Sequence, residues 1–252
     1  MPARSRAREL AARFNASGDP CGWFEPLYRE AEEGRSEVPW ADLRPNPHLL
    51  SLWSTQPWEA SGKTALVVGS GLGDDAEQLA RWGFRTTAFD IAETAIAVAR
   101  RRFPASAVAY IKADLFAPPP SWLASFDFVL EAYTLQVFPA EIRRKVIEKI
   151  SRFVRAPQQT QPGSPASAVV ELAGVEDRRL PGTPGGLLLA IARGREPNDP
   201  EGQMPWPLTR AEVDEFTRFG LEQRRFDDYV DPNEPGVRRF RALYQRTRLA
   251  SD

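Results

Sequence analysis

From residue 64 onwards, short apolar runs alternate with segments of helical periodicity. The runs at 64–69 and 186–191 are apolar throughout, which is typical of strands covered on both faces of a sheet. Residues 139–154 give the clearest helical pattern, with an apolar stripe along one side. Strands that alternate with helices predict parallel pairing in a doubly wound α/β sheet. The expected strands are 64–69, 84–90, 107–112, 126–131 and 186–191, and the expected helices are 74–82, 92–103, 139–154 and 208–218.

The two ends of the chain depart from this alternation. Residues 221–229 and 237–246, joined through a turn with two prolines and a glycine, predict an antiparallel hairpin. This hairpin completes a Rossmann-like, mostly parallel seven-stranded sheet. Residues 1–62 hold few strand signals and most of the tryptophans, and they predict a helical N-terminal lid. The short helices of the lid are expected at 4–16, 24–33 and 47–55. Residues 63–252 are expected to form the main domain.

Residues 156–185 interrupt the rhythm, since they carry five prolines. We interpret them as an insertion between a helix and the next strand, with one small additional strand at 168–172. A helix-to-strand connection lies at the amino ends of the strands, opposite the ligand face of an open α/β sheet. The insertion is therefore expected to lie away from the chemistry.

Charge and composition exclude several classes of protein. With 33 Lys+Arg against 34 Asp+Glu, the net charge of −1 argues against a nucleic-acid partner. Cys21 is the single cysteine, so neither an intrachain disulfide nor a cysteine-based zinc site can form. No apolar run approaches the ~20 residues of a membrane span. The Arg-rich start lacks the apolar core of a secretory signal. We therefore expect a cytoplasmic protein without membrane, nucleic-acid or metal partners, and slightly favour a monomer. The 29 arginines against four lysines indicate a bacterial source.

His48, the single histidine, lies in a turn that opens a predicted helix. A catalytic triad of the usual kind would have to use this one imidazole. We therefore expect a structural or solvent role for His48 and disfavour hydrolase chemistry.

The chemistry is indicated by glycines at 69, 71 and 73, which lead from a strand into a helix. Such glycines let the backbone turn tightly and approach a ligand, and the helix amino terminus presents free N–H groups. Asp90, which ends the next strand, can accept both hydroxyls of an adenosine ribose. A dinucleotide site needs a small residue where Asp74 stands, because a carboxylate repels a pyrophosphate. The pattern instead favours S-adenosylmethionine, with a nicotinamide dehydrogenase and a non-catalytic binder as alternatives.

Further acidic and aromatic residues follow the strands. Asp114, after the third strand, matches a position that contacts the adenine amino group, although a turn cap is the alternative. Glu131 and Tyr133 end the fourth strand, where methyl donor and acceptor are expected to meet. A solvated helix face is the expected place for three other charged residues, which are Asp75, Glu77 and Lys145.

Taken together, these segments resemble the thiopurine, thiol and halide branch of the class I S-adenosylmethionine methyltransferases over 23–155 and 186–246. The resemblance implies an S-adenosylmethionine cofactor, and an acceptor covered by a lid at about 20–45 and a loop at 194–207. The segments that carry it are 38–42, 68–75, 89–91, 113–116, 131–136 and 202–206. Carried over by position, the cofactor-binding residues are Trp40, Gly69, Ser70, Gly71, Asp90, Ile91, Asp114, Leu115 and Glu131. The expected acceptor-binding residues are Phe24, Tyr28, Tyr133, Arg193 and Trp206, and packing in the core or the lid is the alternative for the aromatic residues of the wall.

Three positions depart from known patterns. Val67 stands where an acidic residue is usual, and Arg193 stands where several relatives have an aromatic residue. An arginine there favours an anionic acceptor, unless it pairs with Glu196, Asp199 or the lid. The Asn/Asp-Pro-Pro-Tyr motif of enzymes that methylate DNA bases or amides is missing at 130–133.

The predicted function is methyl transfer to a small-molecule acceptor, and the preferred acceptor is a thiol or other soft nucleophile. Such a transfer needs collinear positioning in a dry pocket more than a strong base. An O- or N-acceptor with an anionic group is the alternative, with Glu131 or Tyr133 as the catalytic proton acceptor. For Tyr133, positioning of the acceptor is preferred over proton transfer. A non-catalytic S-adenosylmethionine-binding protein also stays open.

Overall fold

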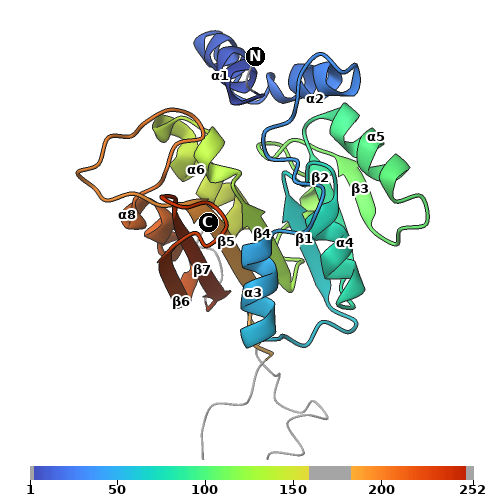
Figure 1. The fold of residues 1–252 in the computed structure, drawn as a ribbon. Helices are drawn as coiled ribbons and strands as arrows, with labels where there is room; N and C mark the ends of the chain where they lie inside the picture. The colour runs from blue at the N-terminus through green and yellow to red at the C-terminus, as the bar shows by residue number, and fades with distance from the viewer. Residues whose placement is uncertain (1–2, 159–182, 248–252) are drawn as a thin grey trace, which may run out of the picture.

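The computed structural model describes residues 3–158 and 183–247, which build one seven-stranded sheet with helices on both faces (Figure 1). The strand order is β3-β2-β1-β4-β5-β7-β6. Neighbours from β3 to β5 are parallel, whereas β7 pairs antiparallel with both β5 and β6. The predicted fold class is therefore confirmed. The strands are β1 (Thr64–Val68), β2 (Arg85–Asp90), β3 (Ala109–Lys112), β4 (Phe128–Ala132), β5 (Leu187–Arg193), β6 (Leu221–Val230) and β7 (Arg238–Arg246).

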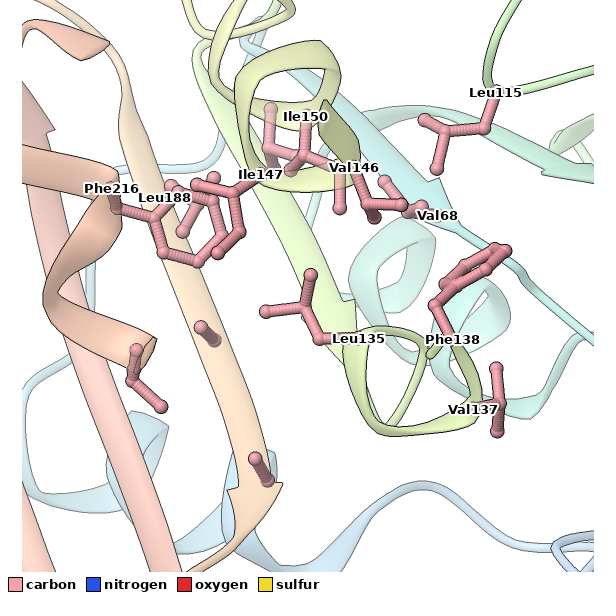
Figure 2. Close-up of a cluster of buried hydrophobic side chains, with 14 of the residues drawn as sticks. Val68, Leu115, Leu135, Val137, Phe138, Val146, Ile147, Ile150, Leu188 and Phe216 are labelled. Carbon is pink, nitrogen blue, oxygen red and sulfur yellow. The ribbon is translucent and has the colours of Figure 1, made fainter. Parts of the chain in front are cut away.

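Alternating side chains of the strands feed two hydrophobic cores. In β1, Leu66 and Val68 face one core, and Ala65 and Val67 face the other. The first core holds α6 (Ala140–Ser151), whose Val146, Ile147 and Ile150 pack over the sheet beside Leu188 and Phe216 (Figure 2). The second core holds α3 (Pro47–Thr55), α4 (Asp74–Arg81) and α5 (Glu93–Arg102). Burial on both faces explains why the parallel strands read as continuous apolar runs.

The remaining helices differ in length from their predicted ranges where local hydrogen bonds end them. The predicted helix at 139–154 ends at Ser151, because Phe153 then turns its carbonyl to the N–H groups of Ser125 and Phe126. The predicted helix at 208–218 divides into α8 (Arg210–Asp214) and η3 (Glu215–Phe219), a 3₁₀ helix. Thr209 and Glu212 form the predicted capping box at its start.

The N-terminal segment divides into two parts with different positions. Helices α1 (Ala3–Ala16) and α2 (Phe24–Glu32) lie together at one end of the sheet, whereas α3 lies along it (Figure 1). Glu25 fixes α2 to α5, because its carboxylate accepts hydrogen bonds from both the N–H and the hydroxyl of Thr94, at 3.0 and 2.7 Å. Leu49 and Leu52 of α3 are fully buried in the second core. Within the 1–62 segment, α1 and α2 therefore lie at one end of the sheet (Figure 1), and α3 belongs to the second core.

The described ends of the 156–185 insertion lie at the amino ends of β4 and β5. The Gly186 N–H donates to the Arg155 carbonyl, and the Arg155 guanidinium donates to Asp127 at 2.6 Å. A bridge joins Gln158 to Thr183. This is the expected end of the sheet, opposite the glycine loop. The small strand predicted at 168–172 lies outside the described residues. Within the described ranges, no helix is both long and apolar enough to cross a membrane.

Candidate functional site

A cavity of about 460 Å³ opens at the carboxyl ends of β1, β2, β4 and β5, where an open α/β sheet binds its ligands. Its size falls in the range of small-molecule sites. The glycine loop, the segment after α2, the residues after β4 and the hairpin of β6 and β7 all contribute walls. Val68, Leu115, Val137 and Phe138, at one end of the core in Figure 2, also line it. The predicted site residues that line it are Phe24, Tyr28, Trp40, Gly69, Ser70, Gly71, Asp90, Ile91, Leu115, Tyr133 and Arg193.

The glycine loop leaves space that side chains would fill. Gly69 and Gly71 have φ of +59° and +52°, which favour glycine. A Cβ on Gly69 would lie 2.8 Å from the Thr134 hydroxyl, and one on Gly71 would lie 3.1 Å from the Tyr28 hydroxyl. The hydroxyl oxygen of Ser70 lines this cradle and is buried, with no hydrogen-bond partner among the described residues. An orphaned polar atom and a glycine cradle fit a bound ligand at this loop.

Asp90 supports the same loop from the end of β2. Its two carboxylate oxygens accept hydrogen bonds from the N–H groups of Gly71 and Ala92, at 3.0 and 2.9 Å. Burial raises the pKa of Asp90 to about 6, although these hydrogen bonds oppose the rise. A carboxylate has about four acceptor positions, so each oxygen can still accept a ribose hydroxyl.

Aromatic residues of the N-terminal segment close over the glycine loop. The Trp40 indole N–H donates to the Tyr28 hydroxyl at 2.9 Å, and that hydroxyl lies above Gly71. Phe24 packs edge-on against Trp40, with ring centroids 6.2 Å apart. Phe24 and Tyr28 were predicted as acceptor-binding residues, and the structure places Tyr28 against the cofactor-side loop.

Three predicted site residues do not line the cavity. The Asp114 carboxylate accepts the Phe116 N–H at 2.8 Å, which is the turn cap that was the alternative to adenine binding. The Trp206 N–H donates to the Gln136 carbonyl at 2.7 Å, and its indole lies under Arg143, while Met204 and Pro205 of the same loop line the cavity.

Glu131 is the third of these residues. It is fully buried, and one carboxylate oxygen accepts the N–H groups of Thr134 and Leu135 at 2.7 and 2.9 Å. Burial raises its pKa to about 7. The side chain therefore shapes the turn that carries Tyr133 and does not reach an acceptor in the cavity, as a catalytic base would.

Tyr133 lies in the cavity wall in a conformation unusual for a non-glycine residue, with φ of +66°. Its N–H donates to the Ile191 carbonyl at 2.9 Å, and the Arg239 guanidinium lies 5.1 Å from its ring centre. Burial raises the pKa of the phenol to about 12, against the opposing effects of Arg239 and Asn46. The phenol therefore stays protonated at neutral pH and can donate a hydrogen bond.

His48 forms a buried network with the hairpin. Its Nε2 lies 3.2 Å from an Asp231 carboxylate oxygen and its Nδ1 lies 2.8 Å from the Tyr229 hydroxyl. Burial lowers its pKa, although Asp231 opposes this effect. Both ring nitrogens are thus engaged, and the structural role expected for His48 agrees with the geometry. The sequence predicted the hairpin but not that Asp231, Asn233, Glu234 and Arg239 would line the cavity, because strand pairing across the sheet leaves no local signal.

The prediction of a solvated helix face is wrong for Asp75 and Glu77 and agrees with the structure for Lys145, which is exposed. Asp75 lines the cavity, and its carboxylate accepts the Asn46 N–H at 2.6 Å. Burial raises the pKa of Asp75 to about 6. The Glu77 carboxylate accepts the Tyr110 hydroxyl at 2.7 Å.

Comparison with known proteins bears on this site. Residues 65–156, which hold the glycine loop, Asp90 and Tyr133, match the model of a family described as a methyltransferase domain. The matched residues bring the glycine loop and the Asp90 carboxylate together at the switch point of the sheet. Over these residues the chain carries a methyltransferase domain, and this supports an S-adenosylmethionine-dependent methyltransferase activity. The match covers methyltransferase domains in general and does not single out the thiopurine, thiol and halide branch.

Solved structures share the fold of this methyltransferase at low sequence identity. One, described by the conversion of a disulfide bond into a thioacetal group during echinomycin biosynthesis, is 18% identical, with a TM-score of 0.61 over 88% of this chain and 91% of that one. The 1,6-didemethyltoxoflavin-N1-methyltransferase of Burkholderia thailandensis is 15% identical, with a TM-score of 0.59 over 98% and 92%. The N-methyltransferase NodS of Bradyrhizobium japonicum is 16% identical, with a TM-score of 0.56 over 96% and 100%. A search of curated proteins by sequence gave no match.

Proposed function

We propose that this methyltransferase transfers the methyl group to a soft nucleophile, a thiol first, on a small molecule. The observation that carries the proposal is the state of the groups around Tyr133 that could take a proton. His48 uses both ring nitrogens, and Asp231 is bound by Arg239 at 2.6 Å. Glu131 lies outside the cavity, and Tyr133 holds its own proton. An acceptor that ionises without help fits such a site, and a thiol with a pKa of ~8.5 does so in part at neutral pH.

The chain's own residues supply positioning and a dry environment. Bound S-adenosylmethionine supplies a methyl group on a positively charged sulfur, which is already activated for displacement. We infer that the backbone of Gly69 and Gly71 and the side chain of Ser70 contact the cofactor, and that the Asp90 carboxylate accepts hydrogen bonds from its ribose hydroxyls. Tyr133 donates its hydrogen bond to the acceptor and fixes its direction, and Trp40 with Tyr28 excludes water from the loop. Holding two reactants in line at about 3 Å can supply several kcal/mol of a barrier.

The remaining cofactor contacts follow from the cavity wall. Ile91 and Leu115 line it and are proposed as apolar contacts of the adenosine. Asp114 and Glu131 are not proposed for this role, because their carboxylates hold backbone N–H groups away from the cavity. The balanced net charge of −1 supports the further proposal of an enzyme without a nucleic-acid partner.

Asp75 favours a second candidate function. Its carboxylate lines the cavity, and burial raises its pKa to about 6. The same carboxylate accepts the Asn46 N–H, and the Asn46 side chain forms a hydrogen bond with the Tyr133 phenol. A carboxylate of that pKa can accept a proton from an O- or N-acceptor at neutral pH. Replacement Asp75→Asn separates the two: it leaves transfer to a thiol within about threefold and removes transfer to a phenol or amine.

The proposal is tested with labelled S-adenosylmethionine and a panel of acceptors. The panel contains small thiols, a thiopurine, iodide, phenols, amines and carboxylates. We expect turnover of thiols, with S-adenosylhomocysteine raising the melting temperature and NAD leaving it unchanged. Turnover confined to phenols or amines would replace the thiol by the second candidate. Stabilisation by NAD alone would overturn the assignment of the cofactor site.

A further inference from the structure

The end of the cavity beyond Tyr133 holds an unequal set of charges. Three guanidinium groups, of Arg4, Arg193 and Arg239, line it together with two carboxylates, of Asp231 and Glu234. The His48 imidazole has an ordinary pKa of 6.5, and burial lowers that pKa, so the ring carries no charge at neutral pH. Among these five side chains, which contact one another, one positive charge is therefore left without a matching carboxylate.

Arg239 is fully paired and is not the source of this surplus. Its Nε donates to Asp231 at 2.6 Å and its Nη2 donates to Glu234 at 2.8 Å. Its side chain is only 9% exposed. Both carboxylates are thus committed to Arg239 first.

Arg193 is the weakly paired member of the set. In the described part of the chain its side chain has one ion-pair contact, in which Nη2 lies 3.8 Å from an oxygen of Glu234. Arg4 contacts the same oxygen, Oε1, at 3.4 Å from the lid helix α1. The expected partners of Arg193 do not fill this role: the Glu196 carboxylate pairs with Arg238, and the Asp199 carboxylate accepts the Glu196 N–H at 2.9 Å.

The position of Arg193 is fixed by the site rather than by its ion pair. It is the last residue of β5, and its backbone N–H donates to the Gln136 side chain at 2.8 Å. Gln136 also lines the cavity and holds the loop that contains Met204 and Pro205 through the Trp206 N–H. A half-buried guanidinium on such a rigid support is costly unless an anion neutralises it.

We propose that the methyl acceptor carries a carboxylate, which binds Arg193 at the end of the cavity and takes the place that Glu234 now fills loosely. This inference rests on the proposed function and names its substrate class, a small thiol carboxylate. A guanidinium binds a planar carboxylate through two parallel hydrogen bonds. A monoanion matches the single surplus charge, whereas a phosphate dianion would add repulsion from Asp231 and Glu234. Arg4 lies close enough to Glu234 to share the bound anion, which would couple acceptor binding to the lid.

The test compares two thiols of equal size, 3-mercaptopropionate and its amide. For the wild type we expect a kcat/KM for the carboxylate at least tenfold above that for the amide, after correction for thiol ionisation. Arg193→Gln should remove this preference, and the change should appear in KM for the carboxylate. Glu234→Gln should lower KM for the carboxylate a few-fold, because it removes the competing anion. Arg238→Gln, a neighbouring surface arginine outside the cavity, serves as the matched control and should keep the preference.

A second measurement does not depend on turnover. The protein saturated with S-adenosylhomocysteine is titrated with 3-(methylthio)propionate, its amide and inorganic phosphate by calorimetry. Binding of the carboxylate that is weakened tenfold or more by Arg193→Gln, with unchanged S-adenosylhomocysteine affinity, supports the proposal even if thiols prove to be poor methyl acceptors. Equal affinity for carboxylate and amide, an unchanged preference in Arg193→Gln, or tighter binding of phosphate would each overturn it.

Discussion

Replacement of Glu131 by glutamine is expected to stabilise the protein in alkaline buffer. The Glu131 carboxylate is fully buried, and burial raises its pKa from 4.5 to about 7. Because the folded state disfavours the ionised form, stability is highest while the group is protonated and falls as the pH rises from about 4.5 to about 7. Glutamine keeps an oxygen that accepts the N–H groups of Thr134 and Leu135 but carries no charge.

The size of the effect follows from the shift in pKa. A difference of about 2.5 units at 1.36 kcal/mol each gives about 3 kcal/mol as an upper bound. The second carboxylate oxygen has no hydrogen-bond partner among the described residues, so the glutamine N–H₂ group that replaces it is buried without an acceptor. That loss costs about 1–3 kcal/mol at every pH. The net gain at pH 8.5 is therefore about 0–2 kcal/mol, while at pH 4 the variant is less stable than the wild type.

The assay is urea unfolding of the two proteins at several pH values between 4 and 8.5. The quantity of interest is the difference in unfolding free energy between variant and wild type, which should rise with pH by about 3 kcal/mol. Asp75 and Asp90 contribute their own pH dependence to both proteins and cancel in this difference. Glu37→Gln, at an exposed position of the loop after α2, is the matched control and should give a flat difference. A Glu131→Gln curve that is flat or falls with pH would refute the reasoning, because the buried group would then be stabilised as an anion.

Three further outcomes test the site and the fold. Gly71→Ala places a Cβ 3.1 Å from the Tyr28 hydroxyl at φ of +52°, and it should weaken S-adenosylhomocysteine binding, measured by calorimetry, at least tenfold. Gly236→Ala, at φ of +84° with open space around it, is the control for backbone strain alone. Tyr133→Phe should lower kcat for a thiol about tenfold without a new limb in the pH–rate profile between pH 6 and 9, and a lost limb would make Tyr133 a proton acceptor. Thr209→Ala removes the capping box of α8 and should lower the unfolding free energy by about 1 kcal/mol, measured in urea, with no change in kinetics.

The periodic pattern predicted the order and type of the elements because burial on two faces leaves a local record. The apolar run at 64–69 and the stripe of Val146 and Ile150 can be read without knowing their neighbours. Element ends were less accurate, as at Phe153, because a carbonyl taken by another segment ends a helix without any residue signal in the helix itself.

The candidate site was predictable where one continuous segment builds it. Gly69, Gly71 and Asp90 belong to a strand–loop–helix–strand unit, and the structure places them in the cavity wall. Asp114 and Glu131 were placed by position in the chain, yet their carboxylates turn to nearby N–H groups that the sequence does not display. The charges of the hairpin were not predicted for this site, since their position depends on the pairing of β7 with β5.

The order of the sheet separates the two halves of the site along the chain. The strands β3, β2, β1 and β4 come from residues 64–132, and they carry the glycine loop, Asp90 and Tyr133. The strands β5, β7 and β6 come from residues 187–246, and they carry Arg193 and the charged hairpin. The two blocks meet at one parallel ladder between β4 and β5. On the proposed roles, substitutions in the second block would change the groups that face the acceptor and leave the glycine loop and Asp90 in place, so that the two halves can change independently of one another.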